Sequence, residues 1–501
     1  MLMTIVQDAA TGAAASPAAA DTPLGLGALL VLFVGGSLAV LAWASRVRPM
    51  NLALGFATTV AMWTFAYVAL LQPGRFAGEA LFAGSVACVL AGGFVAGRFA
   101  PGESSGLRVG LVSATVNLLV IGAFLRDEQG GGGMQRPVLY VAGLFAASAV
   151  LGAVGDRLGR AKPSARRLPA APALLGAVAV ANILVMIVLG GIVTGYEAGL
   201  AVPDWPNSFG HNMLLYPVSE MKGGIFYEHA HRLFGMLVGA TVLAFTALAW
   251  STGGRGLAPL VPRRHDGTPA TPAAARALAV LLLALVITQG VLGGLRVTGN
   301  LTASLDPREL SPSTALAIVH GMLGQVVFGV ALLATFAASG AWDAVRGRAQ
   351  GASIRVLPAI ALAALAMQLF LGASMRHLQS TPTADTGAKI PAWALHGHVT
   401  MALIAFIVVF LAGMRCSKVA DVAPVRALGK ALMHSVGLQL LLGVGALVAV
   451  LLRRGEAVPW WEAASTTAHQ ALGAVLIACA LALAVMARRA TDAGAASAAA
   501  R

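Results

Sequence analysis

Acidic, basic and imidazole side chains come together at one point of an otherwise apolar chain. The segment EHAHR begins at Glu228, and an apolar stretch follows it. On a helix, Glu228 lies three residues from His231 and four from Arg232, so these three side chains share a face and His229 lies off it. Ionisable groups in a membrane helix are costly and usually face a cavity or a cofactor. The cluster therefore predicts a site for chemistry.

Three further histidines stand at comparable places in later apolar segments. They are His320 in VHGMLG, His398 at the end of ALHGH, and His469 in AHQALG. Imidazoles from two facing helices are a standard way to hold a haem iron, with the porphyrin edge-on between them. Pairing His231 with His320, and His398 with His469, predicts two haem sites. The alternative is that each histidine is a hydrogen-bonded packing residue.

The other histidines fit these pairs less well. His229 and His396 each lie two residues before a proposed ligand, so either replaces its neighbour only if the helix register is shifted. For the remaining four, solvated or interfacial roles are predicted. These are His211, His265, His377 and His434.

The elements that position these residues are predicted to be membrane helices. Hydrophobic residues make up 58% of the 501 residues and charged residues 11%, with a mean hydropathy of +0.81. These values exceed those of a soluble domain and indicate an all-α polytopic membrane protein in a lipid bilayer. We expect thirteen spans. They lie at about 24–44, 52–71, 76–97, 106–125, 138–155, 172–193, 228–250, 275–295, 313–336, 354–375, 393–414, 426–452 and 466–487.

The basic residues suit a membrane protein better than a nucleic-acid partner. The net charge is +14, but the Lys and Arg residues are spread through short loops and form no stripe with interleaved aromatics. An external N-terminus and a cytoplasmic C-terminus place most of them inside. Cys88, Cys416 and Cys479 are isolated, so neither a disulfide framework nor a zinc site is indicated.

The spans predict a division of the chain into regions. Residues 24–155 form five helices of unknown role, and a basic linker follows at 156–171. Residues 172–340 and 354–487 then form two pseudo-symmetric four-helix bundles, because GGIVTG and VHGMLG in the first have counterparts LGASMRH and AHQALG in the second. The remaining segments, 1–23 and 488–501, are predicted tails.

The C-terminal two thirds of the chain, about residues 172–487, resembles the heme A synthase family. The loop GGIVTGYEAGLAVPDWP and the segment EHAHR, which fits the family's E-x-x-H-R, carry the resemblance, together with the histidines at 320, 398 and 469. It implies oxidation of the C8 methyl of heme O to the formyl group of heme A, for cytochrome oxidase biogenesis. It also implies that His231 and His320 flank the substrate haem, that His398 and His469 ligate heme b, and that Glu228 is the catalytic carboxylate.

Three observations set limits on the resemblance. The loop that contains PDWP has Val202 and no cysteine, which excludes a role for a thiol in this loop. Val399 follows His398 where the other motif has an arginine, so the propionate partners of heme b are unassigned. The five-helix region lies outside the family core. Arg232 is a candidate for a haem propionate, whereas a plain exposed ion pair is the alternative for Glu228 and Arg232.

Two other functions are compatible with the four histidines. A di-haem b-type protein that only transfers electrons needs the same pairs, although it needs neither Glu228 nor the PDWP loop. A transporter or assembly scaffold without redox chemistry is the third candidate function. For the heme A synthase function we expect heme O and its synthase as partners, an unidentified electron donor, a bacterial plasma membrane rather than a mitochondrial one, and no nucleic acid. The oligomeric state is open, with a homo-oligomer compatible.

Overall fold

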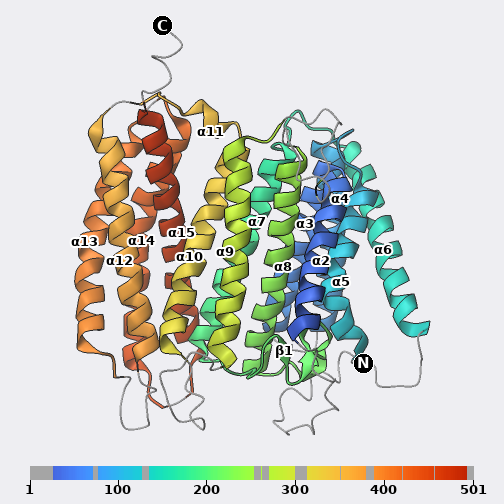
Figure 1. The fold of residues 1–501 in the computed structure, drawn as a ribbon, viewed down its shortest axis with the longest axis horizontal. Coiled ribbons are helices and arrows are strands. Elements are labelled where there is room, and N and C mark those ends of the chain that lie inside the picture. The colour runs from blue at the N-terminus through green and yellow to red at the C-terminus, as the bar shows by residue number, and fades with distance from the viewer. Residues whose placement is uncertain are drawn as a thin grey trace. The chain divides into compact units, whose positions relative to one another are not determined.

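The computed structural model is built almost wholly of α-helices, which confirms the all-α prediction (Figure 1). It describes residues 26–71, 77–126, 135–252, 261, 270–298, 313–349, 351–379, 389–419, 421–455 and 457–492. Within these residues, one long helix corresponds to each predicted span. The long helices are α2 (Leu26–Arg46), α3 (Pro49–Leu71), α4 (Ala77–Phe99), α5 (Gly106–Arg126), α6 (Gln135–Arg160), α7 (Ala171–Gly195), α8 (Gly224–Ser251), α9 (Ala273–Thr298), α10 (Thr314–Ala338), α12 (Ala352–Leu378), α13 (Ala392–Ser417), α14 (Ala423–Leu452) and α15 (Trp460–Thr491).

The helices have the length and composition of membrane spans. Within the described residues, 11 are long and apolar enough to cross a bilayer, and α5 has a shorter apolar stretch over Gly106–Val120. About 20 residues at 1.5 Å each cross the hydrocarbon core. The chain is therefore an integral membrane protein. The remaining described elements are short: the strands β1 (Asn207–Ser208) and β2 (His211–Asn212), the 3-10 helices η1 (Met213–Leu215) and η2 (Val218–Glu220), and the single-turn helix α11 (Ala341–Ala344).

Internal contacts divide the chain into two compact units. Unit 1 comprises Met1–Val185 and Ala201–Ala279, and unit 2 comprises Met186–Leu200 and Val280–Arg501. Unit 1 therefore joins α2–α6 to α8, and unit 2 contains α10–α15. The predicted first bundle contributes helices to both units, so its boundaries stay a prediction.

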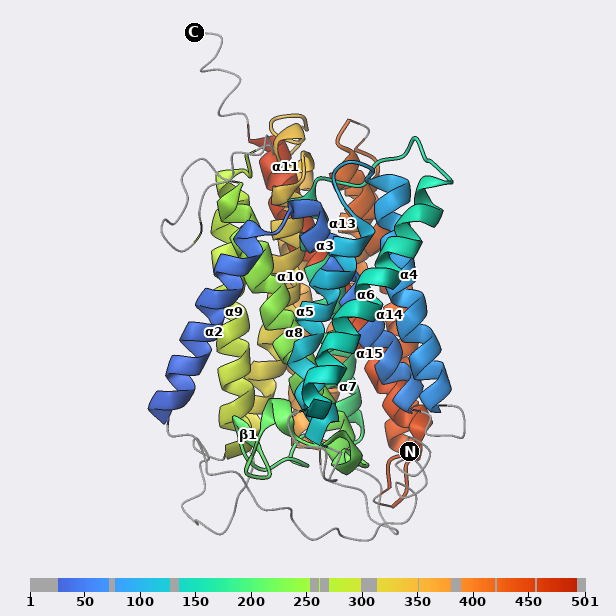
Figure 2. The ribbon, with the colours of Figure 1, turned by 90° about the vertical axis from the view of Figure 1, so that its right-hand side faces the viewer.

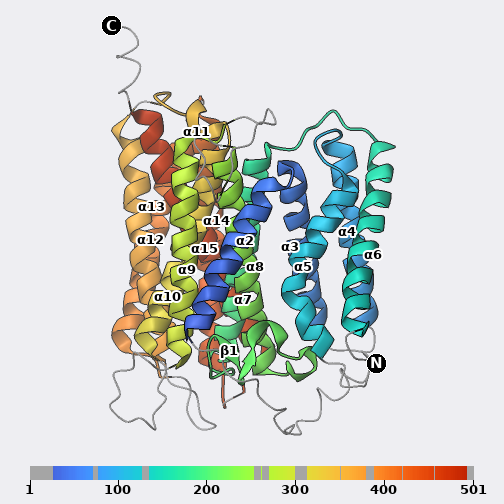
Figure 3. The ribbon, with the colours of Figure 1, turned by 45° about the vertical axis from the view of Figure 1, so that its right-hand side comes forward.

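In unit 1, α3, α4, α5 and α6 pack side by side (Figure 3). The helices approach closely because glycine faces backbone where they cross. A Cβ on Gly152 of α6 would lie 2.2 Å from the carbonyl oxygen of Gly106, and one on Gly155 would lie 2.2 Å from that of Leu90. Small residues allow such backbone contact between membrane helices. The glycines of this region thus serve close helix packing.

The five-helix region also packs against α8, the helix that carries EHAHR. Helix α2 runs beside α8 (Figure 2), and α3 and α5 contact it as well. Trp63 and Tyr67 of α3 meet Phe234 edge to face, with ring centroids 5.6 and 6.1 Å away, and Tyr67 stacks on Phe226 at 5.4 Å. Phe226 and Phe234 lie on either side of EHAHR in the sequence. The region of unknown role is therefore part of the surroundings of that segment.

In unit 2, α12, α13, α14 and α15 form a closed ring of four neighbours, and α10 packs against α12 and α15. Helices α13 and α15 each pack against both α12 and α14, so they lie diagonally across the ring. A core of large apolar side chains fills one end of this bundle. It includes Leu432, Leu476, Leu483 and Met486, each at most 1% exposed.

Candidate functional site

The loop before α8 in unit 1 is a compact, internally bonded structure. Strands β1 and β2 pair antiparallel, with Ser208 opposite His211. The carboxylate of Asp204 accepts hydrogen bonds from the backbone N–H groups of Phe209, at 2.7 Å, and Gly210, at 2.8 Å. Gly210 has a φ of 76°, a left-handed conformation that glycine adopts without strain. The PDWP segment thus closes a tight hairpin through its aspartate.

Arg232 fastens this loop to α8. Its Nη1 donates to the carbonyl oxygens of Asp204, at 2.7 Å, and Asn207, at 3.0 Å, and its Nη2 donates to that of Val202, at 2.7 Å. Its Nε and Nη2 also donate to Oε1 of Glu228, at 3.3 and 3.0 Å. These five contacts match the five N–H donors of a guanidinium. Arg232 therefore holds three loop carbonyls and one carboxylate together.

Glu228 and Arg232 form an ion pair that is buried, in contrast to the exposed pair considered as the alternative. Both side chains are only 8% exposed, because the loop folds over the start of α8. Removing one partner of a buried pair leaves the other charge uncompensated and costs about 3–5 kcal/mol. Arg232 uses its donors within the protein in this structure, so its predicted role at a haem propionate gains no contact here and stays a prediction.

His229 and His231 have different surroundings in unit 1. His229 is completely buried, its Nδ1 lies 3.1 Å from Oγ of Ser208, and its ring centroid lies 4.9 Å from that of Tyr216. Its Nε2 has no hydrogen-bond partner within the described residues. His231 is half-buried. His229 thus belongs to the interface between loop and helix, and the assignment of His231 as the ligand stays a prediction.

Tyr216 contributes to the same interface from the loop. Burial, together with the charge of Glu220 and a hydrogen bond to its carboxylate, raises the pKa of Tyr216 well above its ordinary value. The Tyr216 ring also contacts the ring of His211, with the centroids 6.0 Å apart.

His320 is placed in unit 2 by two residues of α9. Ser313 caps α10 by accepting a hydrogen bond from the N–H of Leu316, so His320 lies two turns into the helix. Nε2 of Gln289 donates to the carbonyl oxygen of His320 at 2.8 Å, and a Cβ on Gly293 would lie 3.0 Å from Cε1 of the ring. The glutamine holds the backbone of His320, and the glycine makes room for its imidazole.

His398 has the same arrangement with α12. Its Nδ1 lies 3.2 Å from the carbonyl oxygen of Gln368, and its Nε2 lies 3.4 Å from Nε2 of that residue. A Cβ on Gly372 would lie 2.7 Å from Cε1 of the ring. Since a carbonyl oxygen only accepts, Nδ1 is the protonated ring nitrogen in this contact.

His469 repeats the arrangement with α14. Nε2 of Gln439 donates to the carbonyl oxygen of His469 at 3.0 Å and lies 3.1 Å from its Nδ1. A Cβ on Gly443 would lie 2.8 Å from Cε1 of the ring. Each of these three histidines is therefore held by a Gln-x-x-x-Gly pattern on the preceding helix.

Two of the predicted ligands come together in unit 2. The ring centroids of His398 and His469 are 6.3 Å apart, and the rings are nearly perpendicular, at 85°. Their helices lie diagonally in the four-helix ring. His231 lies in unit 1 and His320 in unit 2, so their pairing stays a prediction. His396, the alternative to His398, is exposed.

The glutamines and aromatic residues around these histidines were missed by the sequence reasoning. The signal for the glutamines was present, because Gln368 and Gln439 each precede their histidine by 30 residues, and Gln289 precedes His320 by 31. On α7, the position that corresponds to these glutamines is Met186, which precedes Gly190 by four residues. No comparable signal marks Trp63 or Tyr67. Among the described residues, no three or more His, Cys, Asp or Glu side chains converge on a metal-ion site.

The fold and these sites define a polytopic integral membrane protein in which histidines from several helices are held inside the helix packing. Comparison with known families gives the particular group. The model for COX15-CtaA, described as cytochrome oxidase assembly protein, matches residues 173–500. The chain belongs to this family, as the resemblance predicted, and α2–α6 precede the matched region. No match to a curated protein was found.

Proposed function

We propose that the protein is a heme A synthase that oxidises the C8 methyl of heme O to a formyl group. The observation that carries this proposal is the buried Glu228–Arg232 pair, one helical turn from His231, in a chain of the cytochrome oxidase assembly family. A pure electron carrier does not need a buried carboxylate at this place. Heme O, the enzyme that makes it, and cytochrome oxidase are the proposed partners.

The reaction determines what the protein has to supply. Conversion of a methyl to a formyl group, with water as the oxygen source, releases four protons and four electrons. A methyl C–H is not acidic enough for ordinary base catalysis, so bound haem supplies the redox chemistry, with an electron acceptor taking the electrons. Glu228 takes up protons or stabilises positive charge that develops at the porphyrin edge. Arg232 holds this carboxylate in place through two hydrogen bonds to its Oε1.

The residues of the second bundle fit a haem. Two metal–nitrogen bonds of about 2 Å each, plus the half-widths of two imidazole rings, span about 6 Å. The rings of His398 and His469 are 6.3 Å apart. Nδ1 of His398 donates to a carbonyl, which leaves its Nε2 lone pair for a metal, as second-shell partners commonly arrange. Nε2 of Gln439 lies 3.1 Å from Nδ1 of His469 and donates to the carbonyl oxygen of the same residue, so this glutamine positions the second imidazole.

The proposal includes a topology with the N-terminus outside and the C-terminus in the cytoplasm of a bacterial plasma membrane. The Lys and Arg distribution supports it. In this orientation the histidine-bearing ends of α8, α10, α13 and α15 lie in the outer part of the membrane.

The test is Glu228→Gln, which keeps the shape of the side chain and an acceptor for Arg232 but removes the charge. Cells that make heme O should accumulate heme O or a partly oxidised product in place of heme A, while the purified variant retains heme b. Haem extraction and pigment analysis at matched protein level measure both. Wild-type heme A yield would remove Glu228 from the mechanism.

The electron-transfer function is the second candidate, because the His398–His469 geometry suits it equally well. It predicts that the purified protein contains haem but produces no heme A from heme O. The absence of a Soret band would favour the scaffold instead.

A further inference from the structure

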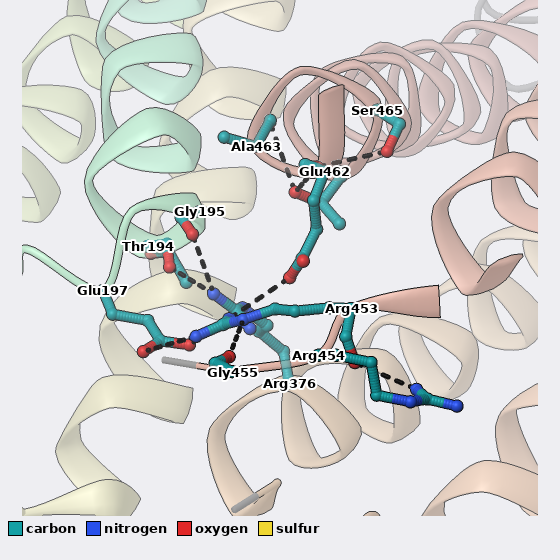
Figure 4. Close-up of polar contacts among 11 residues, drawn as sticks. Thr194, Gly195, Glu197, Arg376, Arg453, Arg454, Gly455, Glu462, Ala463 and Ser465 are labelled. Atoms are coloured by element: carbon teal, nitrogen blue, oxygen red, sulfur yellow. Dashed lines mark hydrogen bonds and ion pairs between the residues drawn. The ribbon is translucent and has the colours of Figure 1, made fainter. Parts of the chain in front are cut away.

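A buried carboxylate lies at the start of α15 in unit 2, where Glu462 belongs to the first turn of the helix (Figure 4). The residue is 1% exposed, although Trp460 and Trp461 beside it are exposed. Oε2 of Glu462 is buried and has no hydrogen-bond partner within the described residues. A buried acceptor without a partner calls for an explanation in a folded protein, and a redox or catalytic role is one of the few available.

The arginine beside Glu462 is held mainly by a different carboxylate. Nη1 of Arg453 lies 2.8 Å from Oε1 of Glu197, and its Nη2 lies 3.4 Å from Oε2 of that residue. The contact of Arg453 with Oε1 of Glu462 is long, at 3.4 Å, compared with about 2.7–2.9 Å for a charge-assisted hydrogen bond. Arg453 therefore keeps its ion pair with Glu197 whether or not Glu462 carries a charge.

Three charged groups from three segments of unit 2 act on this carboxylate. Among the described residues they are Arg453 in the α14–α15 connection, Glu197 after α7, and Arg376 in the last turn of α12. Nη2 of Arg376 donates to two backbone carbonyl oxygens at the end of α7. Figure 4 shows the guanidinium of Arg376 next to that of Arg453. Both arginines thus have other partners, and neither depends on Glu462 alone.

A polar stripe on α15 leads from Glu462 to His469. Residues three, four and seven positions apart lie on one face of a helix, and here these positions are Ser465, Thr466 and His469. Oγ of Ser465 and Oγ1 of Thr466 donate to the carbonyl oxygen of Glu462, at 3.1 and 2.8 Å. Seven residues span about 10 Å along the helix. Charges at the two ends of this stripe act on each other across a buried region, where salt screens them little.

We propose that Glu462 binds one proton when the haem held by His398 and His469 gains one electron, and releases the proton when that electron leaves. This inference rests on the proposed function, because it assumes the haem of the second bundle. The electron comes from oxidation of the substrate methyl group, and the proton comes from water at the nearby end of α15. Oε2 gains the proton, because Oε1 faces Arg453. The added negative charge is thereby compensated inside the membrane, where an uncompensated charge is costly.

The experiment is a redox titration of the haem in the purified, haem-containing protein at a series of pH values. With roughly 10 Å between the charges and an effective dielectric constant of about 20, one electron strengthens proton binding at Glu462 about ten-fold. A ten-fold change corresponds to about 59 mV for one electron. The midpoint potential should therefore be higher at the acid limit than at the alkaline limit by about this amount, and Glu462→Gln should lose most of the difference.

Glu197→Gln is the matched control, because it removes the other carboxylate that contacts Arg453. It should retain the pH dependence of the midpoint potential. Loss of the same difference in Glu197→Gln would assign the effect to the structure around Arg453 and overturn the role of Glu462.

Infrared spectroscopy gives a second readout, which a purely structural carboxylate would not produce. The reduced-minus-oxidised difference spectrum should show the carbonyl band of a newly protonated carboxyl group. Glu462→Gln should abolish this band. Glu462→Asp keeps a carboxyl group and should restore both the band and the pH dependence.

The outcomes separate this inference from the proposed function. A wild-type protein that binds haem with a midpoint potential independent of pH would overturn the role of Glu462 and leave the haem site intact. Equal pH dependence in wild type and Glu462→Gln would do the same. Absence of haem from the purified wild-type protein would overturn the haem site, and this inference with it. Should Glu462→Gln not fold, the wild-type potential and infrared band decide, and absence of either refutes the role.

Discussion

Replacing Arg232 with Met tests whether this residue holds the loop on α8. The change removes three hydrogen bonds to loop carbonyls and the partner of the buried Glu228. A broken buried pair costs about 3–5 kcal/mol, and every 1.4 kcal/mol is about a factor of ten in an equilibrium constant. Opening of the loop should therefore become roughly 100-fold or more favourable.

Hydrogen exchange measures this opening directly, because the N–H groups of Phe209 and Gly210 are bonded to the carboxylate of Asp204 inside the loop. Their exchange should accelerate by about the same factor in Arg232→Met. The matched control is Arg160→Met, which removes another pair at i,i+4 spacing, with Asp156, in which the arginine is 45% exposed. An exposed pair contributes about 0–1 kcal/mol, so little change is expected. Exchange in Arg232→Met within three-fold of wild type would refute the fastening role.

Three other changes have defined outcomes. Gly443→Ala should displace the ring of His469 and lower the haem content of the purified protein several-fold. Gly445→Ala is the control and should retain the haem, because a Cβ at Gly445 would meet nothing within 4 Å. Equal absorption spectra of the two variants would contradict the packing argument. Trp63→Ala removes an edge-to-face contact with α8 worth about 0.5–1.5 kcal/mol and a hydrogen bond, so the melting temperature in detergent should fall, and an unchanged value would count against the α3–α8 contact. A reporter fused after Arg501 should read cytoplasmic, and an external reading would invert the proposed topology.

The helices could be predicted well because each is a long apolar run, and hydropathy alone indicates such a run. The convergence of Glu228 and Arg232 could also be predicted from a local pattern, because residues four apart on a helix lie on the same face. Their burial could not, because it depends on a loop that folds back over α8. The three carbonyls that Arg232 holds belong to residues 25 to 30 positions earlier, and only the loop conformation brings them there.

Contacts between distant segments could not be predicted from the sequence, because they too depend on how the chain folds back on itself. Glu197 and Arg453 are 256 residues apart, and no local pattern connects a loop after α7 with the end of α14. The Gln-x-x-x-Gly pattern is different, because its repeat spacing was visible. The role of this pattern could not be read from the sequence, because a glutamine faces the histidine of the next helix only when the two helices pack as antiparallel neighbours. Neither helix alone shows this contact.

The packing of α2, α3 and α5 on α8 amounts to a subunit interface within one chain. The family match begins at residue 173, so a shorter chain starting there would expose Phe226 and Phe234 of α8 to lipid or to a separate protein. Here the five-helix region is tethered through a short basic segment, and tethering of this kind supplies a partner at an effective concentration of the order of millimolar. The interface can therefore remain occupied with little intrinsic affinity. Cleavage of the tether would turn an intramolecular contact into one that depends on the density of both pieces in the membrane.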